Sequence, residues 1–322
     1  MRSSAMKRPS RFAILAAFAG VYLVWGSTYL AILFAIRSIP PMLMAGSRFL
    51  LAGTILYSAA RLNGAPRPKR IQWRTALIVG ACLLVGGNGG VTLAEQYVPS
   101  GLAALLIATV PLYIALLSWL FGMAPRPSAL AALGLTGGFV GVGLLVGPAL
   151  QVSNSGESPH AWIGMVILLC SSLIWSAGSL YSQKATNIPS PFLAAGQQML
   201  CGGALMIIIG LLTGELRRLD PRHITTLSLW AFVYLVLVGG IVGYGSYAFL
   251  LRYCEPAKVA TYAYVNPVVA VLLGSLFAGE TLTLRMLVAA VLIIGSVAIV
   301  ITGGKSKTAS ASPGMPSLAR AD

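Results

Sequence analysis

The sequence predicts an all-helical (all-α) integral membrane protein with ten transmembrane helices, arranged as two inverted five-helix repeats around a central cavity. The first observation is the composition: of 322 residues, 57% are hydrophobic and 9% are charged, and the mean hydropathy is +0.85. Soluble domains carry about 25% charged residues, so this much apolar surface does not fit a water-facing domain. The other two observations are the lengths of the apolar segments and an internal repeat.

Ten apolar segments have about the 20 residues that a helix needs to cross a bilayer. We expect them at residues 12–35, 42–60, 75–96, 101–121, 129–147, 161–183, 191–212, 229–251, 258–278 and 285–302. The chain then divides into an N-terminal segment (1–11), a first repeat (12–147), a linker (148–160), a second repeat (161–302) and a tail (303–322). The tail is polar and rich in small residues, which predicts disorder.

The basic residues of the connectors indicate the orientation. The net charge is +15, and most Lys and Arg residues of the connectors fall on the side that carries both termini. By the positive-inside rule, both termini are expected in the cytoplasm and the linker 148–160 in the periplasm. The connector "GELRRLDPRH" is a local exception. The rule accounts for the basic composition, so we expect no nucleic-acid partner.

Segments from the two halves of the chain are similar to each other. "LVWGSTYLAI" resembles "LIWSAGSLYS" 150 residues later, which matches Trp25 with Trp175. "VGGNGGVTL" resembles "IVGYGSYAF" 156 residues later, which matches Asn88 with Tyr244. Because each copy has an odd number of spans, the copies are expected to be antiparallel. Inverted repeats of this kind are typical of secondary transporters, whose substrate site lies between the copies near the membrane midplane.

Several blocks resemble the EamA family of the drug/metabolite transporter superfamily, including "VWGSTYLAI", "VPSGLAALLIATVPLYIALL" and "LFAGETLT". The run "GNGGVTLAEQYVPSGLAALLIATVPL" is closest to the YedA-like bacterial inner-membrane subgroup. The resemblance implies ten helices, cytoplasmic termini, and export of small metabolites, amino acids or amphipathic compounds. It also implies that spans one to four and six to nine surround the cavity, with spans five and ten at the periphery.

Charged residues near the predicted spans are few. Family members resembling this chain carry a Glu just after the fourth span of a repeat; the second copy has Glu280 in "GETLT", whereas the first has Ala124. We expect Glu95 and Glu280 to be the only acids near the apolar zone, both toward its outer edge. Arg48 is the only basic residue within a span, and it predicts an ion pair with Glu95. The pair would be an outer gate or purely structural.

The matched tryptophans Trp25 and Trp175 are expected to line the cavity, with packing against lipid or other helices as the alternative. Hydroxyl and amide groups this deep in a bilayer need partners or water, which favours the same cavity for the polar residues around them. The cavity candidates are Trp25, Ser27, Thr28, Asn88, Trp175, Ser179, Tyr244, Tyr247, Tyr262, Tyr264 and Asn266. Pro111 and Pro267 are matched prolines within spans, and each predicts either a gating hinge or a static kink.

The motifs favour transport over catalysis. His160 and His223 lie in polar connectors and the four cysteines form no CxxC pair, so we expect no metal or cofactor. Motifs of intramembrane hydrolases and of nucleotide-driven pumps are missing, so we expect no enzyme. The predicted function is a secondary exporter in the bacterial inner membrane, with a small-molecule substrate and the lipid bilayer as partners; the alternatives are an intramembrane enzyme and a non-transporting scaffold.

Glycines at GxxxG spacing in span five predict close packing of helices. The chain is expected to be a monomer or a homodimer.

Overall fold

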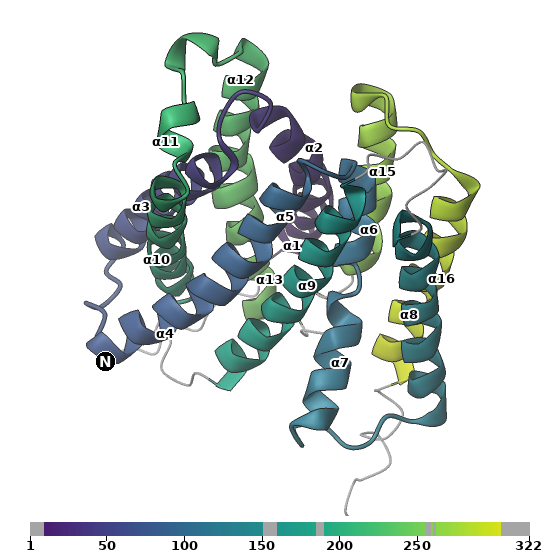
Figure 1. The fold of residues 1–322 in the computed structure, drawn as a ribbon. Coiled ribbons are helices and arrows are strands. Elements are labelled where there is room, and N and C mark those ends of the chain that lie inside the picture. The colour runs from purple at the N-terminus through teal and green to yellow at the C-terminus, as the bar shows by residue number, and fades with distance from the viewer. Residues whose placement is uncertain (1–9, 151–159, 185–189, 255–258, 260–261, 304–322) are drawn as a thin grey trace, which may run out of the picture.

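The computed structural model describes residues 10–150, 160–184, 190–254, 259 and 262–303, and within these ranges all regular secondary structure is helical (Figure 1). The expected N-terminal segment, most of the linker and the expected disordered tail lie outside the described residues. The all-helical class predicted from the sequence is confirmed for the described ranges. The expected domain boundaries stay predictions.

The first half of the chain forms five long helical segments, two of which change helix type along their length and one of which is broken into two α-helices. Their parts are α1 (Arg11–Ala19), η1 (Gly20–Val24), α2 (Trp25–Ala35), α3 (Pro41–Leu62), α4 (Arg70–Gly80), η2 (Ala81–Gly89), α5 (Gly90–Ala94), α6 (Ser100–Ile107), α7 (Val110–Leu120) and α8 (Ala129–Leu150). The first segment is continuous from α1 to α2, and the third from α4 to α5. The third begins at Arg70, a turn before its predicted start, because polar residues in its first turn still adopt helix.

The second half contains five further long segments and two short helices in a connector. Its parts are α9 (Ala161–Lys184), α10 (Pro191–Leu212), α11 (Glu215–Arg218), η3 (Pro221–His223), α12 (Thr226–Tyr234), η4 (Leu235–Gly243), α13 (Tyr244–Tyr253), α15 (Tyr262–Ala278) and α16 (Leu284–Gly303). Across the described residues, nine helices are long and apolar enough to cross a membrane, and the 17 residues of α15 form a shorter apolar helix. The count of ten spans therefore stays a prediction.

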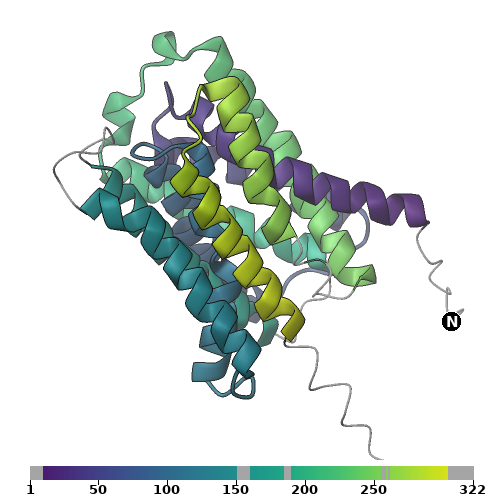
Figure 2. The ribbon, with the colours of Figure 1, turned by 90° about the vertical axis from the view of Figure 1, so that its right-hand side faces the viewer.

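Helices from the two halves interlock. α3 packs along α10, and α8 packs along α16, where Figure 2 shows them side by side on one face of the molecule. α2 packs against α12 and α15, while α9 packs against α5, α6 and α7. The first segment of each half thus contacts the third and fourth segments of the other half, and the centre of the bundle is enclosed by both.

Two of the π-helical stretches fall where the sequence repeats itself. η2 contains Gly86, Gly87 and Gly89, and η4 contains Gly239, Gly240 and Gly243. Glycine is a poor helix former, which makes a departure from α-helical geometry less unfavourable there. π-helical turns are frequent at functional sites, and both of these face the centre of the bundle.

The matched prolines have different local structures. α6 ends at Ile107 and α7 starts at Val110, so the span that contains Pro111 is broken just before it. Pro267, by contrast, lies inside the continuous helix α15. A hinge at either proline stays a prediction, but the two sites are not equivalent in structure.

Serines of the neighbouring helix α9 donate to backbone carbonyls beside the break. The hydroxyl of Ser172 donates to the carbonyl of Leu106 (3.4 Å), and that of Ser176 donates to the carbonyl of Val110 (3.1 Å). Pro111 releases the carbonyl four residues earlier, that of Ile107, so the two serines bond carbonyls on either side of the break and not the released one. The break is therefore supported by the second half of the chain.

Three glycines of the fifth span are covered by other helices of the chain. A Cβ at Gly134 would lie 3.1 Å from the carbonyl oxygen of Ser296, and one at Gly141 would lie 2.9 Å from Ile293, both in α16. A Cβ at Gly138 would overlap the side chain of Leu112 in α7. Small residues let helix backbones approach closely in membranes. These glycines serve packing inside one chain, and homodimerisation stays a prediction.

Candidate functional site

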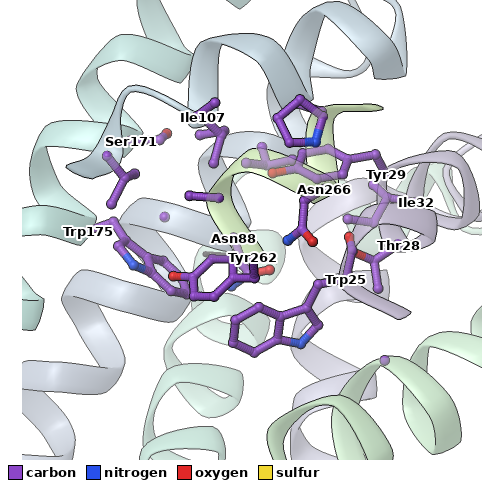
Figure 3. A pocket seen from close by; sticks show the side chains of 18 of the residues that line it. Trp25, Thr28, Tyr29, Ile32, Asn88, Ile107, Ser171, Trp175, Tyr262 and Asn266 are labelled. Carbon is purple, nitrogen blue, oxygen red and sulfur yellow. The ribbon is translucent and has the colours of Figure 1, made fainter. Parts of the chain in front are cut away.

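A cavity with a volume of about 120 Å³ lies at the centre of the bundle (Figure 3). One water needs roughly 10–15 Å³ by this kind of measure, so the space suits several waters or one small organic molecule. The lining residues come from both halves of the chain, on α2, α3, η2, α5, α6, α7, α9, η4, α13 and α15. α8 and α16 contribute none of the lining residues, in keeping with the peripheral place that the family resemblance implies.

Many of the residues singled out from the sequence lie at this cavity. The lining includes the cavity candidates Trp25, Thr28, Asn88, Trp175, Tyr244, Tyr262 and Asn266. It also includes Arg48 and the two prolines Pro111 and Pro267. Asn88 and Tyr244, matched by the repeat, both face the cavity, and Figure 3 shows side chains of α2, α9 and α15 directed into it. Their roles in binding stay predictions.

Three of the polar cavity candidates form hydrogen bonds within the protein and do not line the cavity. The Ser27 hydroxyl lies 2.6 Å from the hydroxyl of Tyr234 and is not among the lining residues. The Ser179 hydroxyl donates to a carbonyl one turn earlier in its own helix (2.8 Å). The Tyr264 hydroxyl donates to the carbonyl of Val297 in α16 (3.3 Å), away from the cavity. Each group satisfies its hydrogen bond within the protein, so a polar residue in a span did not by itself identify the cavity wall.

An aromatic cluster closes one end of the cavity. The ring of Trp25 lies 5.6 Å from that of Tyr244, 5.1 Å from that of Tyr247 and 5.1 Å from that of Tyr262, measured between centroids. Tyr247 thus supports the wall from behind without lining it. Such pairs contribute about 0.5–1.5 kcal/mol each beyond the area they bury. Beyond the cluster lies an apolar core that includes Ala17, Val21, Leu250 and Val259.

The matched tryptophans each rest on a matched glycine of the other half. A Cβ at Gly243 would lie 2.6 Å from Nε1 of Trp25, and a Cβ at Gly87 would overlap the ring of Trp175. Gly87 and Gly243 are 156 positions apart in the repeat, and the tryptophans are 150 apart. The missing side chains therefore make room for the indole rings that form the cavity walls.

We expect Gly87→Ala to move Trp175 and Gly243→Ala to move Trp25, because the added methyl group takes the place of the ring. The measurement is the fluorescence emission maximum of one tryptophan with the other five replaced by Phe. Gly87→Ala should shift the emission of Trp175 and leave that of Trp25 unchanged, and Gly243→Ala should do the reverse. Equal shifts of both tryptophans in either variant would contradict the pairing.

The ion pair predicted between Arg48 and Glu95 is not formed. The two side chains are 4% and 3% exposed, but within the described residues no Glu95 oxygen lies within 4.0 Å of an Arg48 nitrogen. Both Glu95 oxygens lack a hydrogen-bond partner. Arg48 instead donates to Oδ1 of Asn88 (3.3 Å) and lies over the ring of Phe49, 4.5 Å from its centroid. Similar depth in neighbouring spans was not sufficient to bring the charges together.

Glu280 binds the start of a helix from the other half. Its Oε1 accepts hydrogen bonds from the backbone N–H and the hydroxyl of Ser100 (both 2.7 Å), and its Oε2 accepts from the N–H of Gly101 (2.9 Å). These N–H groups open α6 and have no partner within the helix. A carboxylate at a helix N-terminus is favoured both by hydrogen bonding and by the helix dipole. Glu280 is therefore a cap that joins the turn after α15 to α6, and its role as an ion-pair or gate candidate beside Arg48 and Glu95 stays a prediction.

Glu215 caps a second helix in the same way, which the sequence did not reveal. Its Oε1 and Oε2 accept from the N–H groups of Met42 (3.2 Å) and Leu43 (2.9 Å), at the start of α3. Glu215 is 5% exposed although it lies in the connector "GELRRLDPRH". The expectation that Glu95 and Glu280 are the only acids near the apolar zone is wrong, because the short helix α11 turns this carboxylate inward.

The first repeat keeps the turn that carries Glu280 but not the carboxylate. The N–H of Glu280 donates to the carbonyl of Gly274 (3.1 Å), and the N–H of Ala124 donates to that of Ser118 (3.0 Å). Both pairs are related by the offset of 156 residues. The backbone of this turn is thus alike in the two copies. Only the second copy has a carboxylate there that can cap a helix, because the first has Ala124.

Several lining residues were missed. Tyr29 and Ile32 lie on α2 one turn and two turns beyond Trp25, and Ser171 lies on α9 one turn before Trp175. Residues three or four apart share a helix face, so the helical period starting from either tryptophan would have found them.

Apolar spans around a central, partly polar cavity define an integral membrane protein of the transporter type. The chain belongs to the EamA-like transporter family, which matches it twice, over residues 11–147 and 162–302. The uncharacterized inner membrane transporter YedA of Escherichia coli (strain K12) is 38% identical over 295 residues, which are 90% of this chain and 91% of that protein. The resemblance to the EamA family seen in the sequence is confirmed.

Two further comparisons agree. A probable amino-acid metabolite efflux pump of Salmonella typhimurium is 28% identical over 295 residues, which are 88% of this chain and 93% of that protein. A solved crystal structure superimposes with a TM-score of 0.62 at 22% identity, covering 90% of this chain and 98% of that chain. At this identity the structural likeness shows the shared fold.

Proposed function

We propose that the protein is a secondary transporter of the bacterial inner membrane that exports small metabolites, such as amino acids or amphipathic and cationic compounds. Export would proceed by alternating access between two inverted repeats. Five spans in each repeat, ten in all, would make the two copies antiparallel in the membrane. The observation that carries this proposal is the central cavity, because both halves line it and each half supplies one of the matched tryptophans Trp25 and Trp175. The name of the Salmonella typhimurium relative supports the substrate class.

The packing supports a mechanism in which one half rocks against the other. Each half covers the first segment of the other with its third and fourth segments, as symmetry-related copies would. In transporters built from inverted repeats, the site lies between the copies and is exposed alternately to each side. With both termini in the cytoplasm, the aromatic cluster around Trp25 closes the cytoplasmic end, and Glu215 and Glu280 cap helices at the periplasmic end.

The alternatives have less support. Among the described lining residues there is no His, Cys, Asp or Glu, which are the usual acids, bases and nucleophiles of an enzyme. A non-transporting scaffold would not require a cavity whose walls alternate between two similar halves. Flux measurements separate transport from both alternatives, since neither an enzyme nor a scaffold moves a solute unchanged across a membrane.

We expect Trp25→Ala and Trp175→Ala each to reduce flux at least tenfold, because each removes a wall of the cavity. The measurement is uptake into proteoliposomes across a panel of amino acids, sugars and cationic compounds, with and without a proton gradient. Trp230→Ala is the matched control, since this tryptophan of α12 is 67% exposed and is not among the lining residues.

The same panel of compounds also shows which results would support or overturn the proposed function. Selective flux of at least one small solute is the expected result. Absence of selective flux for every compound would overturn the assignment as a transporter. Flux that is unaffected by both cavity substitutions would leave transport intact and overturn the assignment of the cavity as its pathway.

A further inference from the structure

Among the described residues that line the cavity, Arg48 carries the one formal charge. It projects from the second turn of α3 and is 4% exposed. The other lining side chains are aromatic, aliphatic, hydroxyl or amide groups. A charge placed inside a membrane protein is unfavourable unless it is paired, and it usually marks the site of an ion or a substrate.

The contacts of Arg48 within the protein leave most of its binding capacity unused. A guanidinium has five N–H donors and keeps its positive charge. In the described structure one of them donates to a neutral acceptor, Oδ1 of Asn88, at the long distance of 3.3 Å. The Nε–H group is buried and has no hydrogen-bond partner. The ring of Phe49 beneath the guanidinium adds a cation–π contact but no negative charge.

The buried acid expected to neutralise Arg48 does not do so. Glu95 has no oxygen within 4.0 Å of the guanidinium and does not line the cavity. Glu95 therefore acts on Arg48 only from beyond contact distance, and a buried cation loses several kcal/mol of hydration that no direct ion pair restores here. An anion that enters the cavity would supply the missing negative charge, because Arg48 belongs to the cavity lining.

We propose that Arg48 is the anion anchor of the transport site and that the transported solute carries a carboxylate. Nε and one terminal nitrogen of a guanidinium match the two oxygens of a carboxylate in a bidentate pair. A single Arg suits a carboxylate with one negative charge better than a phosphate monoester with nearly two. This inference rests on the proposed transport function and narrows its substrate class.

The rest of the cavity fits the body of such a solute. Trp25, Tyr262 and Trp175 provide aromatic walls for a hydrocarbon side chain. Their ring faces also accept an ammonium group, so an amino acid satisfies the site as well as a simple carboxylate. An amine without a carboxylate brings a second positive charge close to Arg48 and gains nothing from it. Amphipathic carboxylates, including apolar amino acids, are therefore preferred over purely cationic compounds.

The test compares ligands that differ only in the carboxylate. The probes are L-phenylalanine and phenethylamine, L-leucine and 3-methylbutylamine, with 3-phenylpropionate as a carboxylate without an amine. Binding to the purified full-length protein is measured by calorimetry or by thermal shift. We expect the carboxylates of at least one pair to bind at least tenfold more tightly than the matching amine. Equal binding within both pairs, or no binding of any carboxylate, would overturn the proposal.

Variants then assign the preference to Arg48. Arg48→Gln introduces the residue that the second repeat has at position 198, and it should lower carboxylate affinity at least tenfold without lowering amine affinity, because it also removes a like charge. Arg48→Lys keeps the positive charge but not the two parallel N–H donors of the guanidinium, so it should give an intermediate loss of carboxylate affinity. Arg37→Gln is the matched control, since Arg37 also lies over a phenylalanine ring (4.7 Å, Phe34) but is exposed and outside the lining. Melting temperatures show which variants are folded.

A fourth variant distinguishes the anchor from the gate predicted from the sequence. Glu95→Gln should keep the carboxylate preference. If it reproduced the loss seen in Arg48→Gln, the two residues would act as a pair and the anchor would be wrong. If cationic compounds alone were transported and Arg48→Gln did not change their flux, the carboxylate class would fail while the transport function stood. Absence of flux for the whole panel is the separate failure of the proposed function.

Discussion

Gly46→Ala and Gly203→Ala are each expected to destabilise the protein by about 1–3 kcal/mol, the usual effect of overpacking a tight contact. The two glycines face each other where α3 crosses α10. A Cβ at Gly46 would lie 2.9 Å from the carbonyl oxygen of Gly203, and a Cβ at Gly203 would lie 2.9 Å from that of Gly46. Backbone atoms cannot rotate away as side chains do, so the helices must separate.

The seam has a second contact of the same kind, which the repeat relates to the first. A Cβ at Gly53 would lie 3.1 Å from the carbonyl oxygen of Gly196, and one at Gly196 would lie 2.8 Å from the backbone nitrogen of Tyr57. Gly46 matches Gly196 and Gly53 matches Gly203 at the offset of 150 residues. α3 and α10 are thus two similar helices, and each presents its pair of glycines to the other.

The measurement is the melting temperature of the purified protein, with a double-mutant cycle. Because either added methyl separates the same two backbones, Gly46→Ala and Gly203→Ala together should cost less than the sum of the single effects. Gly46→Ala combined with Gly141→Ala, in the separate seam of α8 and α16, should be additive. Additive effects in both combinations would contradict the reciprocal contact.

Glycines without close neighbours provide a control, because their substitution by Ala is not expected to lower stability. A Cβ at Gly143 in α8 or at Gly295 in α16 would meet no atom within 4 Å. Ala is the better helix former by about 1 kcal/mol, so these substitutions should be neutral or stabilising. A loss at Gly143 equal to that at Gly46 would indicate that glycine is needed for a reason other than close packing.

The helices were predictable from sequence because a span is defined by length and hydrophobicity, and both are local properties. Among the spans whose predicted starts lie in the described residues, the third and eighth had the largest errors, because their helices begin at Arg70 and Thr226 and extend past the apolar zone into polar residues. The resemblance between the halves also indicated which residues would converge. Asn88 and Tyr244 were matched by the repeat alone, and both line the cavity.

What the sequence could not provide is the partner of each polar group. Ser27 and Tyr264 have the same polarity as lining residues, yet their hydroxyls meet Tyr234 and the backbone of α16. The choice depends on the rotation of each helix about its axis, which is set by packing against helices far away in sequence. The same reason explains Glu215, whose carboxylate reaches α3 only because α10 ends beside the start of that helix.

Glu280→Ala is expected to lower stability by about 3 kcal/mol or more and to loosen the end of the bundle where α15 meets α6. The substitution leaves two backbone N–H groups and the hydroxyl of Ser100 without an acceptor, and Ser100 is fully buried. Hydrogen bonds to a charged group contribute about 1.5–3 kcal/mol each, and leaving a buried donor unpaired costs as much as a lost bond. Glu280→Gln keeps one acceptor oxygen and should show a smaller loss.

The local consequence is measured by hydrogen–deuterium exchange of the amides at the start of α6. Exchange at Ser100 and Gly101 should rise in Glu280→Ala, while exchange at Met42 and Leu43 should stay unchanged, since Glu215 still caps those. Glu215→Ala should give the reverse pattern. If both variants loosened both helix starts equally, the caps would act only through global stability.

Asp220→Asn provides the control for removal of a carboxylate as such. Asp220 pairs with His223 at 2.8 Å, but their side chains are 52% and 84% exposed, and exposed pairs contribute about 0–1 kcal/mol. Asp220→Asn should therefore change stability much less than Glu280→Ala.

The cap formed by Glu280 also bears on the proposed alternating access. In the proposed mechanism, opening the end where α6 meets the turn after α15 would require the two to part, so the cap on α6 would be a contact that breaks. Glu280→Ala is therefore expected to favour the state that is open at this end, and increased cysteine labelling at Tyr29→Cys from that side would detect it.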